Sequence, residues 1–171
     1  MDTAGWIDHA ALSVTDLDRS ERFYTTVLDF VLLVDFGYAR SFVHRPTGFL
    51  LALVRHPDGD RAPFSELRTG LDHLGLTASS REELVGWETR LGAAGVPVTP
   101  IRDMPFGAHL NFRDPDGIPL EFSAPSQVLL DGLREVRKRD LPPEEIRARV
   151  AEHLRAWGVP ESELPRSREP A

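Results

Sequence analysis

Near the start of the chain, polar and apolar positions alternate, and this alternation predicts a half-buried strand over residues 5–14. Positions 9, 11 and 13 fall on one face of that strand, and the apolar positions 10, 12 and 14 fall on the other. Helical spacing follows, with Thr15 and Asp16 as N-cap candidates. Three further strands are expected at 29–36, 38–45 and 49–56. The first part of the chain therefore predicts the order β-α-β-β-β.

The same order is expected a second time, after residues 57–69, which carry Gly, Pro and charge without a period and are interpreted as a linker. Residues 71–78 alternate like the first strand, and Ser80 with Glu83 forms a capping box that predicts the start of a helix. The remaining strands are expected at 96–101, 108–114 and 118–124. Two prolines within 96–101 indicate an edge strand there, because proline cannot donate a ladder hydrogen bond.

The two halves align with each other directly. His9 and His73 each follow an Asp, and Gly48 and Gly117 each precede the last strand of their half. The first pair is 64 positions apart and the second 69, a difference that loops absorb easily. Duplicated units of this size usually share one core and one interface cavity, so we expect two βαβββ modules that pair around a shared cavity. The expected boundaries are 1–125 for this α+β domain, with modules at about 5–56 and 70–125.

Residues 126–171 form a C-terminal helical extension that the two modules do not need. Two helices are expected in it, and the second carries an apolar stripe at Ile146, Val150, Leu154 and Trp157. That stripe must pack against something, either the domain or a second copy of the chain. The composition near the end of 160–171 predicts a flexible terminus.

Composition narrows the chemistry of the chain. Of its 171 residues, 41% are hydrophobic and 27% charged, and the formal net charge of −7 argues against a nucleic-acid partner. No apolar run is long enough to span a bilayer and the N-terminus lacks a signal-peptide pattern, so we expect no membrane role and a cytoplasmic location by default. The chain has no cysteine, so any metal must be held by His, Asp, Glu or backbone oxygen.

Three ionisable residues stand out because of their places in the repeat. His9 and His73 lie on the strand faces predicted to point away from the helices, and Glu121 lies in mid-strand with the same orientation. Each residue alone is more often structural than functional. On faces that converge when the modules pair, the three form a 2-His-1-carboxylate set, which suits divalent first-row ions and leaves coordination positions open. Ala52 occupies the position of Glu121 in the first module, so no fourth ligand is expected there.

Four segments of the chain resemble a known family. They are "IDHAALSVTDLDRSERFYTTVLDF", "LDHLGLTA", "LGAAGVPV" and above all "FRDPDGIPLEF", within residues 5–125. The chain is similar to the vicinal oxygen chelate superfamily, also called the glyoxalase, bleomycin-resistance and dioxygenase family. The resemblance implies paired βαβββ modules around a metal cavity, with ligand positions that fall on His9, Ala52, His73 and Glu121. Ala52 departs from the carboxylate usual in glyoxalase I, which argues against a lactoylglutathione lyase. A His-His-Glu set is more like ring-cleaving dioxygenases, the hydroxyphenylpyruvate dioxygenase type or fosfomycin-resistance transferases.

Further cavity residues are predicted from strand parity. His109 and Asn111 should face the same cavity as Glu121, and their first-module counterparts in the repeat alignment are Arg40 and Phe42. His109 is the candidate general acid or base, because an imidazole gains or loses a proton near neutral pH. Two more substrate-binding candidates are His56, at the rim, and Phe106, in an apolar lip or an ordinary loop at residues 102–109.

Two functions from different classes remain open on the sequence. The first is an enzyme with one divalent metal ion, Fe(II), Mn(II), Ni(II) or Zn(II), that chelates a small oxygen-bearing substrate and performs dioxygenase-like or lyase/isomerase-like chemistry. The second is a metal-free protein that binds a small molecule such as an antibiotic, as bleomycin-resistance members do. A homodimer is expected, and the cavity could form within one chain or between two swapped chains.

Overall fold

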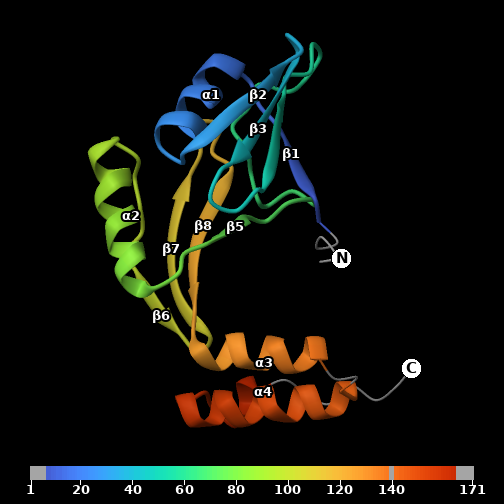
Figure 1. Cartoon of the computed structure of the whole chain (residues 1–171), viewed down its shortest axis with the longest axis vertical. Coiled ribbons are helices and arrows are strands. Elements are labelled where there is room, and N and C mark those ends of the chain that lie inside the picture. Colours follow the sequence, from blue (N-terminus) through green and yellow to red (C-terminus); the bar gives the residue numbers. More distant parts are fainter. Residues whose placement is uncertain (1–6, 139–140, 165–171) are drawn as a thin grey trace.

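The computed structural model describes residues 7–138 and 141–164, and it contains two four-stranded mixed sheets (Figure 1). The first module has the strand order β1-β4-β3-β2, with β1 parallel to β4 and the other pairs antiparallel. Its elements are β1 (His9–Ser13), α1 (Leu17–Thr26), β2 (Phe30–Asp35), β3 (Ala39–His44) and β4 (Leu50–Val54).

The second module repeats this topology with the strand order β5-β8-β7-β6. Its elements are β5 (Leu74–Thr77), α2 (Arg81–Ala93), β6 (Arg102–Met104), β7 (Gly107–Arg113) and β8 (Pro119–Pro125). Again the first and last strands are parallel neighbours. The predicted α+β class and the duplicated β-α-β-β-β order are therefore confirmed.

One predicted strand is wrong. Residues 96–101 form only an isolated bridge, between Val98 and Phe112, and the edge strand of the second sheet is β6 at Arg102–Met104. Pro97 and Pro100 have no N–H to give to a ladder, so regular pairing begins only after them. The segment 102–109, expected as a lip or loop, is instead the β6–β7 hairpin.

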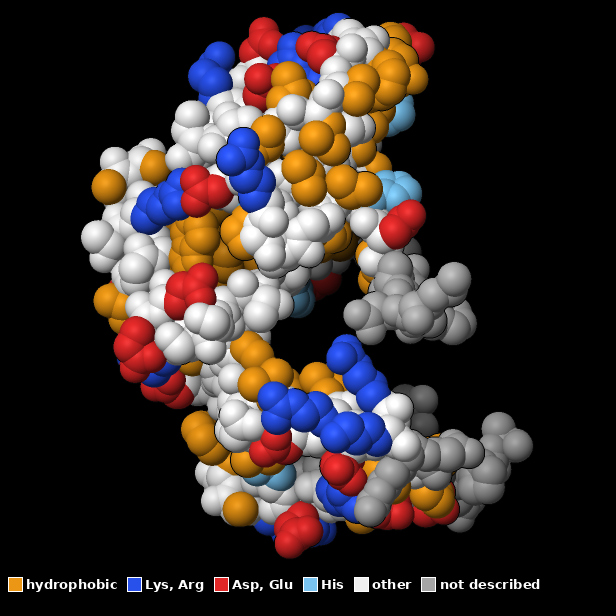
Figure 2. All heavy atoms as spheres, viewed as in Figure 1, with side chains coloured by type: hydrophobic (Ala, Val, Ile, Leu, Met, Phe, Trp, Pro, Cys, Tyr) orange, Lys and Arg blue, Asp and Glu red, His pale blue; other side chains and the backbone are white. Residues whose placement is uncertain are grey.

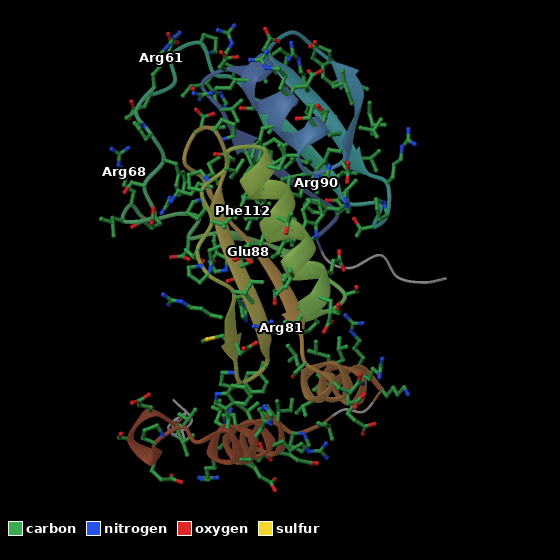
Figure 3. The ribbon with its side chains drawn as sticks, turned by 90° about the vertical axis from the view of Figure 1, so that its left-hand side faces the viewer. Arg61, Arg68, Arg81, Glu88, Arg90 and Phe112 are labelled. Atoms are coloured by element: carbon green, nitrogen blue, oxygen red, sulfur yellow. The ribbon has the colours of Figure 1, made fainter. Side chains whose placement is uncertain are left out.

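Both helices begin where the sequence places their caps. The Asp16 side chain accepts from the backbone N–H groups of Asp18 and Arg19, and the Ser80 side chain accepts from that of Glu83. Each helix covers one face of its sheet, as Figure 3 shows for α2 with Arg81, Glu88 and Arg90 along it. The buried hydrophobic residues of the two modules form one core cluster. The opposite sheet face is called the open face below.

Two buried carboxylates of the β7–β8 turn join the second module to the first. Asp116 accepts from the backbone N–H of Thr15 at 3.0 Å and pairs with Arg19 at 2.5 Å, both at the start of α1. Asp114 accepts from the Tyr24 hydroxyl of α1 at 3.2 Å. Because these carboxylates are only 5% and 8% exposed, they depend on these partners for the hydrogen bonds they lose with water.

A second contact joins the modules at the other end of α1. Arg90 of α2 pairs with both carboxylate oxygens of Asp29, at 2.5 and 2.7 Å, and donates to the Thr26 carbonyl at 3.1 Å. A bidentate pair of this kind fixes orientation as well as distance. The two modules of one chain are therefore held in a defined arrangement.

The C-terminal extension contains α3 (Gln127–Lys138), α4 (Pro143–Trp157) and a short 3₁₀ turn at Glu161–Glu163. His153 of α4 lies 2.6 Å from the Pro105 carbonyl and packs its ring 4.9 Å from that of Phe106, so the helices are attached to the β6–β7 turn. They lie beyond the end of the second sheet, and a hollow separates them from the first module (Figures 1 and 2). The predicted flexible terminus concerns residues 165–171, which lie outside the described part of the chain.

Neither helix of the extension has a fully buried residue among those described. Trp157, the last position of the predicted apolar stripe, is 52% exposed. None of the helices in residues 7–138 and 141–164 is both long and apolar enough to cross a bilayer.

We predict that Asp114 makes the stability of the fold depend on pH. Burial, and next the charge of Asp116, raise the pKa of Asp114 from 3.8 to about 6. The folded chain then binds this proton more tightly than the unfolded chain, so stability falls as the pH rises from about 4 to about 6. Over that pH range the free energy of unfolding of the wild type should fall by at most about 3 kcal/mol because of this group. Asp114→Asn should not show this fall, because its amide has no proton to lose over this range.

Urea denaturation at several pH values measures this effect. The matched control is Asp131→Asn, which removes an exposed carboxylate paired with Arg134 and should keep the wild-type pH dependence. Parallel curves for wild type and Asp114→Asn would contradict the prediction.

Candidate functional site

Strand register shows which residues share an open face. In the second module, Gly75, Glu121 and Asn111 lie opposite one another across β5, β8 and β7. In the first module, the equivalent row across β1, β4 and β3 is Ala11, Ala52 and Ser41. Ala11 is two residues after His9, and Gly75 is two residues after His73. The predicted equivalence of Ala52 and Glu121 therefore agrees with the register of both sheets.

The open face of the second module carries an interacting acid and base. The Nδ1 atom of His109 lies 2.8 Å from the Oε1 atom of Glu121, with side chains 27% and 17% exposed. When the imidazole is protonated, His109 and Glu121 form an ion pair. Asn111 is directly opposite Glu121, and it lines a surface pocket together with His73. The structure thus brings four of the predicted site residues to one face of one module.

The repeated Asp-His dipeptide has a structural explanation in both modules. The His9 Nδ1 atom lies 2.7 Å from the Asp8 carboxylate, and the His73 Nδ1 atom lies 2.6 Å from the Asp72 carboxylate. The hydrogen bond to His9 lowers the pKa of the Asp8 carboxyl. A carboxylate on Nδ1 fixes the imidazole and directs Nε2 outward, which is the usual support of a metal-binding histidine.

The three predicted metal ligands do not meet within one chain. In the described part of the chain, no three His, Asp or Glu side chains are close enough together to hold a metal ion. His9 belongs to the first module, while His73 and Glu121 belong to the second. The imidazoles of His9 and His73 are 57% and 46% exposed, so neither is a buried structural histidine. Imidazole and carboxylate donors suit a divalent ion, but within the described residues of one chain these three do not form a group that could hold one.

Arg40 and Phe42 were assigned to the wrong face. Phe42 is fully buried opposite Leu51, on the helix-covered side. Arg40 lies on that side too, where it pairs with Asp18 and Glu21 of α1 at 2.8 Å. The residues of β3 that do lie on the open face are Ala39, Ser41 and Val43.

The error has a simple physical origin. Ser41 and its partner Ala52 are 11 positions apart, whereas Asn111 and its partner Glu121 are 10 apart. The β3–β4 hairpin is therefore one residue longer than the β7–β8 hairpin, and a shift of one residue moves every side chain to the other face. The residues of β3 that lie on the open face could have been identified only from an alignment of that strand that does not use the turn glycines as its anchor.

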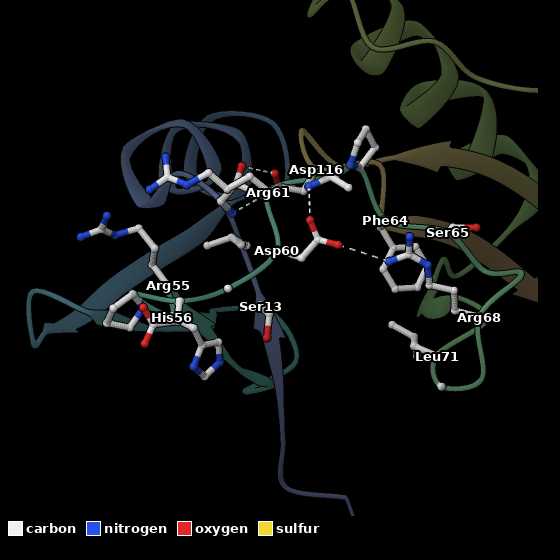
Figure 4. Close-up of a pocket in the computed structure, with 18 of the residues that line it drawn as sticks. Ser13, Arg55, His56, Asp60, Arg61, Phe64, Ser65, Arg68, Leu71 and Asp116 are labelled. Carbon is white, nitrogen blue, oxygen red and sulfur yellow. Dashed lines mark hydrogen bonds and ion pairs between the residues drawn. The ribbon is translucent and has the colours of Figure 1, made fainter.

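His56 and Phe106 lie away from the open faces. His56 lines a cavity of about 610 Å³ between the end of β1 and the linker, opposite Phe64, Arg68 and Leu71 (Figure 4). Phe106 sits in the β6–β7 turn against His153 of α4. Their predicted roles in substrate binding stay untested.

Comparison with known proteins identifies the family. The model described as Glyoxalase/Bleomycin resistance protein/Dioxygenase superfamily matches residues 6–122. The chain belongs to this superfamily. No curated protein matches the chain.

Solved structures show the same fold. A glyoxylase/bleomycin resistance protein/dioxygenase domain from Frankia sp. EAN1pec is 38% identical, with a TM-score of 0.66 over 72% of this chain and 100% of that one. A lactoylglutathione lyase from Agrobacterium tumefaciens is 24% identical, with a TM-score of 0.58 over 71% and 95% of the two chains. A mutant of the fosfomycin resistance protein FosX from Listeria monocytogenes, complexed with Mn(II) and a dihydroxypropylphosphonic acid, is 21% identical, with a TM-score of 0.58 over 74% and 94%.

The corrected place of Phe42 predicts the effect of truncating it. Phe42→Ala should lower the free energy of unfolding by about 3–5 kcal/mol, because it leaves a cavity in a closed core. Tyr38→Ala, in the adjacent hairpin at 62% exposure, is the control and should cost less than about 1 kcal/mol. Urea denaturation of both variants checks this. A cost for Phe42→Ala as small as that of the control would place Phe42 on the open face after all.

Proposed function

We propose that the chain is a divalent-metal-dependent enzyme that binds a small oxygen-bearing substrate on the metal. His9, His73 and Glu121 would hold one Fe(II), Mn(II), Ni(II) or Zn(II) ion, and the reaction would be dioxygenase-like or lyase/isomerase-like. The observation that carries the proposal is the equivalent placement of two imidazoles, each braced at Nδ1 by its own carboxylate, together with Glu121 on the open face. Two imidazoles and one carboxylate suit these ions and leave positions for substrate.

We further propose that the site is completed by two copies of the chain, as a homodimer. His9 of one copy would meet His73 and Glu121 of the other. Two observations support this: the three residues do not cluster in the described part of one chain, and the contacts of Asp116 and Arg90 fix the modules of that chain. The resemblance to the family allows a cavity between swapped chains. An isologous two-fold interface would create two equal sites per dimer.

Each residue of the site has a role in this proposal. A bound divalent ion would stabilise negative charge that develops on substrate oxygens. Asp8 and Asp72 hold the two imidazoles with Nε2 outward. His109, whose Nδ1 atom lies 2.8 Å from the Oε1 atom of Glu121, would exchange a proton with substrate. Asn111, opposite Glu121, would orient substrate through its amide.

A second candidate function is metal-free binding of a small molecule such as an antibiotic. It is favoured by the exposed apolar residues on the open face of the first module, including Val34 and Leu50. The two candidates differ in whether His9, His73 and Glu121 act together on a metal.

We predict one divalent ion per chain in protein purified without added metal, measured by elemental analysis. Glu121→Ala should lose it, because one of three protein ligands is removed. Glu88→Ala, on α2 (Figure 3), is the matched control and should keep the wild-type metal content. Wild-type protein that stays metal-free after incubation with all four ions would overturn the enzyme proposal and favour the second candidate.

We also predict that two inactive variants restore each other. His9→Ala and Glu121→Ala chains, expressed together, form mixed dimers in which one of the two sites has all three ligands. With random pairing, half of the dimers are mixed, so about a quarter of all sites should bind metal. Each variant alone should bind almost none. No recovery in mixed dimers isolated with two different tags would show that the ligands come from one chain.

A further inference from the structure

The two open faces differ sharply in chemistry. Two adjacent rows cross the first sheet: the row of His9 continues through Leu50, Val43 and Val31, and the row of Ala11 continues through Ala52, Ser41 and Val34. In the second sheet, the row of Gly75 continues through Glu121 and Asn111, and the row of Thr77 continues through Ser123, His109 and Arg102. In these rows the face of the first module is mostly apolar and the face of the second module is mostly polar.

The apolar face has a stepped shape beside His9. Leu50 lies directly opposite His9, and Val43 directly opposite Leu50, so bulky side chains form one row. The next row has only small side chains at Ala11, Ala52 and Ser41. Directly opposite residues in a sheet bring their Cβ atoms within about 5.5 Å, so the small row forms a continuous shallow floor along the bulky one. Ala52, where the family pattern has a ligand, is the centre of this floor.

Positive charge is sparse on both faces. The open-face rows named above contain one arginine, Arg102, on the edge strand β6. Arg113, at the end of β7, lies on the same face, but its guanidinium pairs with the Glu66 carboxylate at 2.5 Å. A substrate with a doubly charged phosphonate or phosphate would meet no arginine cluster of the kind that binds such groups.

We propose that the first module supplies the specificity wall of the site, and that the substrate has a flat, uncharged, apolar body with its oxygens at one end. The body would lie on Ala52 and against Leu50 and Val43, while the oxygens point to the polar face of the second module. This inference rests on the proposed function, because it needs the two faces to oppose each other. It names Ala52 and Leu50 as specificity-determining residues.

The test uses Zn(II)-loaded protein, because zinc has no redox chemistry of its own, and titration calorimetry with two probes. 4-Methylcatechol has a flat apolar ring with two adjacent oxygens, and propylphosphonate has a charged head. We expect 4-methylcatechol to bind at least about tenfold more tightly. Ala52→Leu should weaken 4-methylcatechol binding by about tenfold or more by filling the floor, with unchanged zinc content.

A second variant tests the wall by size. Leu50→Ala enlarges the site and should shift preference from 4-methylcatechol towards 4-tert-butylcatechol, which a general loss of structure cannot do. Val128→Ala, an equally apolar change on α3 at 52% exposure, is the control and should alter neither affinity. Tighter binding of propylphosphonate, no binding of either catechol, or an Ala52→Leu variant with wild-type affinity would each overturn the inference.

The same titrations on metal-free protein separate the two proposals. If the protein takes up no zinc but catechol binding still depends on position 52, the proposed metal-dependent enzyme is overturned and the specificity wall stands. Glu121-dependent zinc uptake without catechol binding would overturn the specificity wall and leave the metal site intact.

Discussion

The contact of the Asp114 and Asp116 carboxylates with α1 and with Thr15 just before it is the interaction on which the rest of the structure depends. It places two carboxylates of the second module beside Thr15, Arg19 and Tyr24 of the first, out of solvent. Buried carboxylates are costly unless their partners stay in place, so the two modules cannot rotate freely. The Arg90–Asp29 pair is a second fixed contact between the modules, and in this arrangement no three His, Asp or Glu side chains of the described residues form a group that could hold a metal ion.

The two halves share a topology and differ in chemistry. Both modules keep the Asp-His dipeptide, the capped helix and the same strand order. They differ in the row two residues further along, where the first has Ala52 and the second has Glu121. If His9, His73 and Glu121 bind a metal as proposed, Ala52 leaves the set with three ligands. In this account, the substitution at position 52 both lowers the number of ligands and makes room for substrate.

Local patterns predicted most of each module and little of how the modules are arranged. Alternation and caps located the strands and helices, because these signals act over a few residues. The alignment of Ala52 with Glu121 agreed with the observed register because both lie close after the turn glycines. The predicted placement of Arg40 and Phe42 on the open face was wrong because the β3–β4 hairpin is one residue longer than the β7–β8 hairpin, which moves each side chain to the opposite face. No local pattern reveals that extra residue. Prolines displaced the edge strand from 96–101 to Arg102–Met104.

Long-range contacts were beyond the sequence. The attachment of His153 to the Pro105 carbonyl spans 48 positions and the Asp116–Thr15 contact spans 101, and neither has a periodic signal. The measurement that tests the central claim most directly is a crystal structure of the protein grown with Mn(II), with anomalous scattering used to locate the ion. The account predicts one peak per chain, bound by His9 of one copy and by His73 and Glu121 of the other. A peak held by residues of a single copy, or none near Glu121, would contradict it.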